Sequence, residues 1–215
     1  MLIVYSIVFS KIMRIDIPNY TMFLFTALIP WTFFTTTISQ GSLAIVANGG
    51  LLKKVYFPRE IIPISVVTSS AINFLISCVI MFFFILVSGL GFSWYVLLFP
   101  IILLSQYILL LGITFITSSL TVYARDLEHI ISVLLMVLFY ATPIVYSMDM
   151  VPESLRLLLL LNPMTSIISS YRDILFYKQM PNLFQLILII VISIIILFVG
   201  LIIFRVLQKN FAEEL

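Results

Sequence analysis

The residues of this sequence that could take part in chemistry are few, and they fall in short polar segments. Asp, Glu, Lys and Arg make up only 9% of the 215 residues. The most compact cluster of cations is Lys53, Lys54 and Arg59, with the rings of Tyr56 and Phe57 between them. Such a cluster can donate hydrogen bonds to an acidic partner while the rings offer an apolar anchor. On the residues alone, an ordinary loop beside a membrane, with lysines that extend to the interface, explains the same pattern.

Several kinds of active site are excluded because the sequence lacks their residues. A phosphate-binding loop needs a Gly-Lys pair, and the sequence contains none. Ion-driven transporters keep ionisable groups or broken helices at mid-membrane, and diphosphate transferases need acidic clusters for a metal. The long apolar intervals of this sequence contain no Asp, Glu, Lys, Arg or His, which argues against both classes. His129 is the single histidine, and alone it predicts no metal site. We therefore predict a chain that is not an enzyme and holds no cofactor or metal.

The composition indicates a protein whose main solvent is lipid. Hydrophobic residues make up 63% of the chain and the mean hydropathy is +1.26, whereas soluble domains carry about 25% charged residues. The net charge of +2 comes without a basic stripe that would indicate nucleic acid. The single cysteine, Cys78, allows no disulfide within the chain. The predicted fold class is an all-α membrane protein.

Long uncharged intervals place the membrane spans. A span needs roughly 20 apolar residues, and the intervals without a charged residue are 17–52, 61–124, 130–148 and 179–204. The second suits two spans, divided at Gly89, Gly91 and Ser93, with Trp94 and Tyr95 placed as interfacial anchors. Five full spans are therefore predicted: 20–43, two within 61–124, one within 130–148 that ends at 143–146, and 183–204.

Two further apolar segments are too short to cross a bilayer. Residues 1–10 are expected to be the far half of a span whose beginning is absent, which makes a bundle of about six transmembrane helices with the first truncated. Residues 157–171 are uncharged but interrupted by Asn162-Pro163, and broken backbone at membrane depth must be shielded by protein. We expect two short re-entrant helices there, before the last span. Without repeats or linkers, residues 1–215 are predicted to form a single domain.

The loop 48–60 is placed in the cytoplasm because it carries the densest cluster of Lys and Arg. Alternation of the spans then gives six such residues inside and five outside, a small preference. Those inside are Lys53, Lys54, Arg59, Arg125, Arg205 and Lys209, and those outside are Lys11, Arg14, Arg156, Arg172 and Lys178.

Three polar segments, taken in order, carry a resemblance. They are Asn48-Gly49-Gly50-Leu51-Leu52-Lys53-Lys54-Val55-Tyr56-Phe57-Pro58-Arg59-Glu60-Ile61-Ile62-Pro63, then Tyr123-Ala124-Arg125-Asp126-Leu127-Glu128-His129-Ile130, then Tyr140-Ala141-Thr142-Pro143-Ile144-Val145-Tyr146 with Leu161-Asn162-Pro163 and Tyr171-Arg172. As a set they resemble the permease subunits of the type-2 ABC exporter family, in particular the branch that exports O-antigen, capsular polysaccharide and teichoic acid. That family has six spans preceded by a cytoplasmic amphipathic helix, and we expect this sequence to lack that helix and the start of the first span.

The resemblance implies partners and a cargo. Two permeases would pair as a homodimer in the bacterial plasma (inner) membrane, with two separate ATP-binding cassette subunits that hold ATP and Mg. The cargo would be a lipid-linked glycan. The residues alone leave open a related permease that exports a drug or a lipid, and a membrane scaffold that transports nothing.

The resemblance also implies roles for residues. The loop 48–60 corresponds to a coupling helix that fits a cleft on the ATPase, with a second cytoplasmic contact at Arg125 and Asp126, for which a surface ion pair is the alternative. The kink at Pro143 would help to shape an outer gate, although prolines that simply end helices explain it equally well. The coupling residues would be Asn48, Leu51, Lys53, Lys54, Val55, Tyr56, Phe57, Pro58, Arg59 and Glu60, and those of the outer gate Pro143, Tyr146, Asn162, Pro163, Tyr171 and Arg172.

Overall fold

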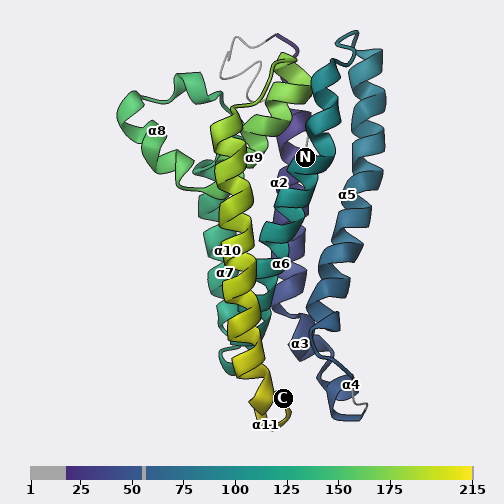
Figure 1. Cartoon of the computed structure of the whole chain (residues 1–215), viewed down its shortest axis with the longest axis vertical. Helices are drawn as coiled ribbons and strands as arrows, with labels where there is room; N and C mark the ends of the chain where they lie inside the picture. The colour runs from purple at the N-terminus through teal and green to yellow at the C-terminus, as the bar shows by residue number, and fades with distance from the viewer. Residues whose placement is uncertain (1–17, 55–56, 215) are drawn as a thin grey trace. The chain divides into compact units, whose positions relative to one another are not determined.

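Helices are the only regular elements in the part of the chain that the structure describes. The computed structural model describes residues 18–54 and 57–214 (Figure 1). The prediction of an all-α membrane protein is confirmed, while the predicted half-span at 1–10 lies outside the described residues. The elements are α2 (Tyr20–Ser42), α3 (Ala44–Ala47), α4 (Gly49–Lys54), α5 (Ile61–Val87), η2 (Trp94–Leu98), α6 (Phe99–Tyr123), α7 (Leu127–Tyr140), η3 (Met148–Met150), α8 (Glu153–Leu160), α9 (Pro163–Arg172), η4 (Asp173–Tyr177), α10 (Leu183–Leu207), η5 (Gln208–Asn210) and α11 (Phe211–Glu214).

Four helical segments of the described chain are long and apolar enough to cross a bilayer, and each coincides with a predicted span. They are α2, α5, η2 with α6, and α10 with η5. The 27 residues of α5 give a length of about 40 Å at about 1.5 Å per residue, more than the hydrocarbon thickness of about 30 Å. The turn after α5 contains Gly89 and Gly91 at φ +75° and +65°, a conformation that glycine adopts readily. The predicted turn is therefore confirmed.

The predicted span within 130–148 is shorter in the structure. α7 ends at Tyr140 after 14 residues, or about 21 Å, which is less than the hydrocarbon core requires. Thr142 precedes Pro143, and the residue before a proline is disfavoured in helical conformation. The amide of Ile144 instead donates to the carbonyl of Thr142 over 2.7 Å. Residues 141–146 therefore form turns and bends rather than the end of a helix.

The two short helices predicted around Asn162-Pro163 are present as α8 and α9. The side-chain oxygen of Asn162 accepts a hydrogen bond from the Met164 amide (3.0 Å), and Pro163 is the first helical residue, a favoured pairing at a helix start. α8 begins at Glu153, four residues before the predicted start, and has no buried residue. Eight of the ten residues of α9 are buried. The two helices therefore differ in role: α9 is shielded by protein and α8 lies at the surface.

The chain divides into two compact units. Unit 1 comprises the described residues of Met1–Thr32 with Phe74–Leu103 and Leu138–Ile189, and unit 2 comprises Phe33–Asn73, Leu104–Val137 and Ile190–Leu215. Five helices (α2, α5, α6, α7 and α10) contribute residues to both units. The prediction of a single domain stays a prediction.

Within unit 2, α6 and α10 approach each other at two glycines. A Cβ added to Gly112 would lie 2.6 Å from the backbone nitrogen of Leu197, and one added to Gly200 would overlap the carbonyl oxygen of Gly112. Side chains cannot occupy such positions, so the contact depends on glycine on both helices. Small residues that allow backbones to touch are a common means of helix association in membranes. This contact fixes how the second half of α10 lies on α6.

Candidate functional site

The first half of the loop 48–60 is a pair of short helices joined at Asn48. The Asn48 side-chain amide donates to the Ala44 carbonyl over 2.8 Å, and its own carbonyl accepts from the Leu51 amide over 3.0 Å. Asn48 therefore ends α3 and begins α4, as local side-chain hydrogen bonds allow. Val55 and Tyr56, like the side chains of Lys53 and Lys54, lie outside the described residues.

The second half of the loop is held against its own unit. Phe57 packs on an apolar cluster, and the Arg59 guanidinium donates to the Gln208 carbonyl. Glu60 accepts a hydrogen bond from Arg205 over 3.0 Å. We call the buried part of this cluster the Phe211 cluster; it consists of Ala44, Ile45, Ile62, Phe115, Val122, Phe204 and Phe211.

Part of the loop remains on the surface. Leu51 on α4 is 49% exposed, and Pro58 is exposed as well. An open hollow of about 520 Å³ lies beside it, lined by Phe57, Pro58, Arg59, Glu60, Gln208 and Lys209. The loop thus offers an exposed apolar residue on a short helix and a hollow lined by two cations and one carboxylate, features suited to binding a protein partner.

A second polar cluster lies in unit 1 and is centred on Arg172, which is 3% exposed. Its guanidinium donates to the carbonyls of Pro143, Ile144 and Tyr146. The same group lies 3.6 Å from the centre of the Phe23 ring, in cation–π geometry. We call this arrangement the Arg172 clasp. It satisfies the carbonyls of the turn after α7, which have no helix to supply a donor.

The other predicted gate residues of unit 1 lie on or beside the clasp. The Asn162 side-chain amide donates to the Thr142 hydroxyl over 2.9 Å. Tyr171 is fully buried, with its ring 5.4 Å from that of Phe99 and 6.1 Å from that of Phe74. The structure thus joins Arg172 to the carbonyls of Pro143 and Tyr146 and joins Asn162 to the neighbouring Thr142. Gating itself stays a prediction.

Burial controls the charge of the groups at the end of α9. It lowers the pKa of the Arg172 guanidinium to about 9, although nearby tyrosine hydroxyls oppose the shift. The cation is therefore retained at neutral pH. Burial also raises the pKa of Asp173, against the effect of the hydrogen bond that Gln179 donates to it. The clasp is thus a fixed positive charge that carbonyls and a ring stabilise, without a carboxylate partner among the described residues.

Comparison with known proteins identifies the family. The family model for ABC-2 type transporters matches residues 1–176. The chain belongs to the ABC-2 type transporter family. It is 37% identical over 216 residues to the O-antigen export system permease protein RfbA of Myxococcus xanthus, covering 100% of this chain and 83% of that protein. Two proteins of the same name from Klebsiella pneumoniae are 37% and 38% identical, over 99% of this chain and 82% of each relative.

Family membership settles the class of molecule. As an ABC-2 chain with several helices long enough to cross a bilayer, it is a multi-pass membrane subunit of a transporter. It is not itself catalytic, because nucleotide binding and hydrolysis in this family belong to a separate subunit.

In this ABC-2 chain the predicted second contact, Arg125 and Asp126, forms the exposed turn between α6 and α7. The Asp126 carbonyl accepts from the amides of His129 and Ile130, over 3.1 and 3.3 Å. Among the described residues, the two side chains form no ion pair with each other, and no hydrogen bond joins this turn to the loop 48–60. The turn therefore starts α7 and leaves both charged side chains exposed.

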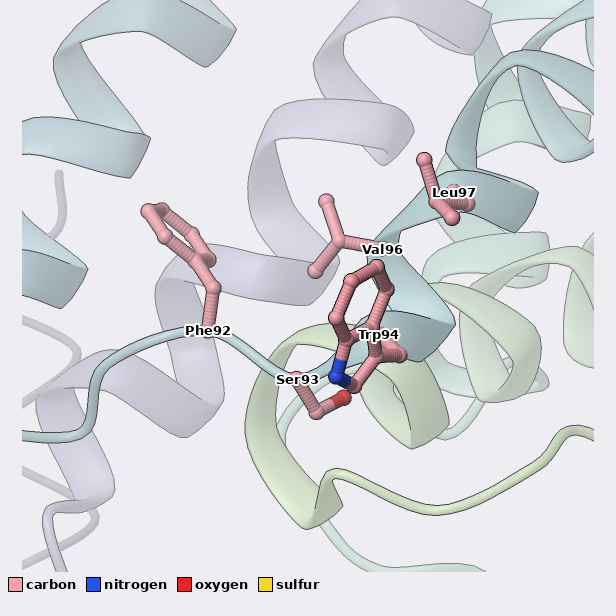
Figure 2. A pocket seen from close by; sticks show the side chains of 5 residues that line it. All are labelled: Phe92, Ser93, Trp94, Val96 and Leu97. Atoms are coloured by element: carbon pink, nitrogen blue, oxygen red, sulfur yellow. The ribbon is translucent and has the colours of Figure 1, made fainter.

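The turn that leads into η2 forms an open hollow of about 350 Å³ (Figure 2). Its lining residues are Phe92, Ser93, Trp94, Val96 and Leu97. Trp94 is 87% exposed, which suits the predicted role of an interfacial anchor. The lining is apolar apart from Ser93, so the hollow offers little for chemistry.

Sequence reasoning missed the residues on which the loop 48–60 rests. Phe204 and Phe211, both fully buried, join Arg205 and the Gln208 carbonyl as partners of the loop. A signal was present, because Phe204 and Phe211 are seven residues apart and so share one helical face. The cytoplasmic placement of this segment had been predicted without any binding role.

Proposed function

We propose that this chain is the permease subunit of an ATP-driven exporter that moves a lipid-linked polysaccharide, of O-antigen, capsule or teichoic-acid type, across the bacterial plasma membrane. Two copies would pair, and two ATP-binding cassette subunits carrying ATP and Mg would dock on them. The observation that most strongly supports this proposal is the match of nearly the whole chain to three permeases named for O-antigen export.

The loop 48–60 is the part we propose as the coupling element. Its second half is tied to its own unit through Phe57, Arg59 and Glu60, while Leu51 on α4 is exposed. Lys53 and Lys54 follow on the same short helix. A partner that presses on α4 would therefore act on a segment with firm internal contacts, which supports the transmission of force.

The charge pattern supports an external source of energy. The four long helices carry a single Asp, Glu, Lys or Arg within their α-helical parts, Arg205 in the last turn of α10. Proton- and ion-driven carriers keep ionisable groups at mid-membrane. The four long helices therefore offer no Asp, Glu, Lys, Arg or His at mid-membrane for a coupled proton, and ATP bound by a partner fits better.

The experiment is deletion of the gene in its native host, with complementation by the wild type. Surface polysaccharide should disappear and a lipid-linked glycan should accumulate inside the cell. The complemented strain should recover, and a tagged chain should co-purify with an ATP-binding subunit. Normal surface glycan together with accumulation of a drug or a lipid would favour the other exporter class. Absence of both an ATP-binding partner and an accumulating cargo would favour a scaffold.

A further inference from the structure

The end of α10 and the residues after it lie in unit 2 against the loop 48–60 and the end of α6. We infer that residues 205–214 act as a brace that fixes the second half of the loop to α10, so that a push on α4 moves α10 as well as α5. The inference rests on the proposed coupling role of the loop, and it adds a positioning role for Phe211, Arg59 and Tyr123.

The first observation concerns the carbonyls at the end of α10. The last carbonyls of a helix have no partner within it and carry the negative end of its dipole. The Tyr123 hydroxyl donates to the Leu207 carbonyl at the end of α10 over 2.8 Å. The Arg59 guanidinium donates to the Gln208 carbonyl in η5, which also accepts from the Phe211 amide. The donors come from the end of α6 and from the loop 48–60. The end of α10 and the short helix η5 that follows it are therefore each hydrogen-bonded by a segment that a coupling element would need to move.

The second observation is the burial of Phe211 on the short helix α11. Its side chain is 0% exposed, and its ring lies 5.6 Å from that of Phe204 and 6.4 Å from that of Tyr123. The Arg59 guanidinium lies 5.9 Å from the centre of the same ring. Phe211 therefore contacts α10, α6 and the loop 48–60 at once. A fully buried ring cannot itself touch a docked subunit, which separates its role from docking.

The ion pair between Arg205 and Glu60 makes a smaller contribution. The Arg205 side chain is 67% exposed and that of Glu60 is 28% exposed, and exposed ion pairs stabilise little. Glu60 directly precedes α5, whose residue Ile62 is in the Phe211 cluster. Residues 57–60 are thus joined to the start of α5 by the chain and to the end of α10 by the brace.

The test uses the complete transporter, reconstituted in vesicles with its ATP-binding subunit, and the purified permease. One measurement is the ATP hydrolysed per glycan exported. The other is the rate of trypsin cleavage after Lys53 and Lys54, which needs no cargo. Phe211→Ala removes the buried ring and Phe211→Leu keeps most of its apolar volume. Val206→Ala is the matched control, because the Val206 side chain is 61% exposed and lies outside the Phe211 cluster.

Phe211→Ala should speed cleavage about tenfold or more, since the cavity favours local opening of the loop, and should raise the ATP used per glycan several-fold. Phe211→Leu should recover most of both values, and Val206→Ala should match the wild type. If Phe211→Ala does not fold, Tyr123→Phe removes a single hydroxyl and should shift both values about two- to threefold.

The proposal of a brace would be overturned if Phe211→Ala, or Tyr123→Phe where that variant replaces it, showed the wild-type rate of trypsin cleavage and the wild-type ratio of ATP to glycan. Faster cleavage with an unchanged ATP-to-glycan ratio would overturn its coupling role. A wild-type complex that exports no glycan would instead refute the proposed function, while the trypsin comparison still decides whether the brace exists.

Discussion

Replacing Arg172 by methionine should lower the free energy of unfolding by about 2–4 kcal/mol. The variant loses hydrogen bonds to the carbonyls of Pro143, Ile144 and Tyr146, and bonds to a charged group are worth about 1.5–3 kcal/mol each. It also loses the contact with the Phe23 ring, worth about 1–2 kcal/mol. Methionine also removes the cost of burying a cation, which is several kcal/mol. The net loss of stability is therefore smaller than the sum of the lost interactions.

The assay is thermal unfolding of the purified protein in detergent, followed by intrinsic fluorescence. In a chain of this size 1 kcal/mol shifts the midpoint by about 2–4 °C, so a fall of about 5–15 °C is expected. Arg172→Lys should lie between the two, because an ammonium keeps the charge but cannot span three carbonyls as a planar fork does.

The matched control is Arg156→Met in the same unit. Arg156 donates to the carbonyls of Val151 (2.9 Å) and Asp149 (3.2 Å), but it is only partly buried. Loss of the Arg156 guanidinium should lower the free energy of unfolding by about 1 kcal/mol or less. Equal midpoints for Arg172→Met and the wild type, or equal falls for the two arginine variants, would refute the argument that the clasp holds the turn after α7.

Three further changes test other contacts. Gly200→Ala should destabilise by about 1–3 kcal/mol, because its Cβ would overlap backbone of α6; thermal unfolding measures the loss. Asn162→Ala should cost about 1–3 kcal/mol, since it removes both a helix cap and a side-chain hydrogen bond; the same assay applies. The double change Lys53→Glu and Lys54→Glu should leave insertion intact and abolish both export and co-purification of the ATP-binding subunit.

Each of these changes has a control or a contrary result. Gly50→Ala meets nothing within 4 Å and should be neutral or slightly stabilising in its helix; equal losses at both glycines would contradict the contact between α6 and α10. Asn182→Ala removes only a cap on α10, so Asn162→Ala should cost more. Normal export by the double lysine variant would count against the coupling assignment.

Much of the fold follows from where the charges are absent. The uncharged intervals predicted α2, α5, α6 and α10 because lipid excludes charge over the length of a span. The break at Asn162-Pro163 was visible because a cap and a proline act locally. The length of α7 was not predicted: composition shows that 130–148 is apolar, but the helix ends at Tyr140, before Thr142-Pro143.

The site was predicted in its residues more than in its contacts. The three segments that carried the resemblance contain the loop 48–60 and Arg172 with the carbonyls it binds, but the partners elsewhere in the chain, such as Phe23, depend on tertiary packing. Nothing in the local sequence around Arg172 shows that it is 3% exposed. The contact between Gly112 and Gly200 was missed because each helix supplies one glycine, so that neither contains a Gly-x-x-x-Gly pair.

Three of the five arginines in the described chain share a use that changes how the coupling loop should be tested. Arg59, Arg156 and Arg172 all donate to backbone carbonyls at turns or helix ends. Irregular backbone within a membrane protein needs such donors, because lipid supplies none. Reversal of Lys53, Lys54 and Arg59 together would therefore remove a docking charge and an internal brace at once. Loss of export in that triple variant would not distinguish them, whereas the lysine pair and Phe211 changed separately would.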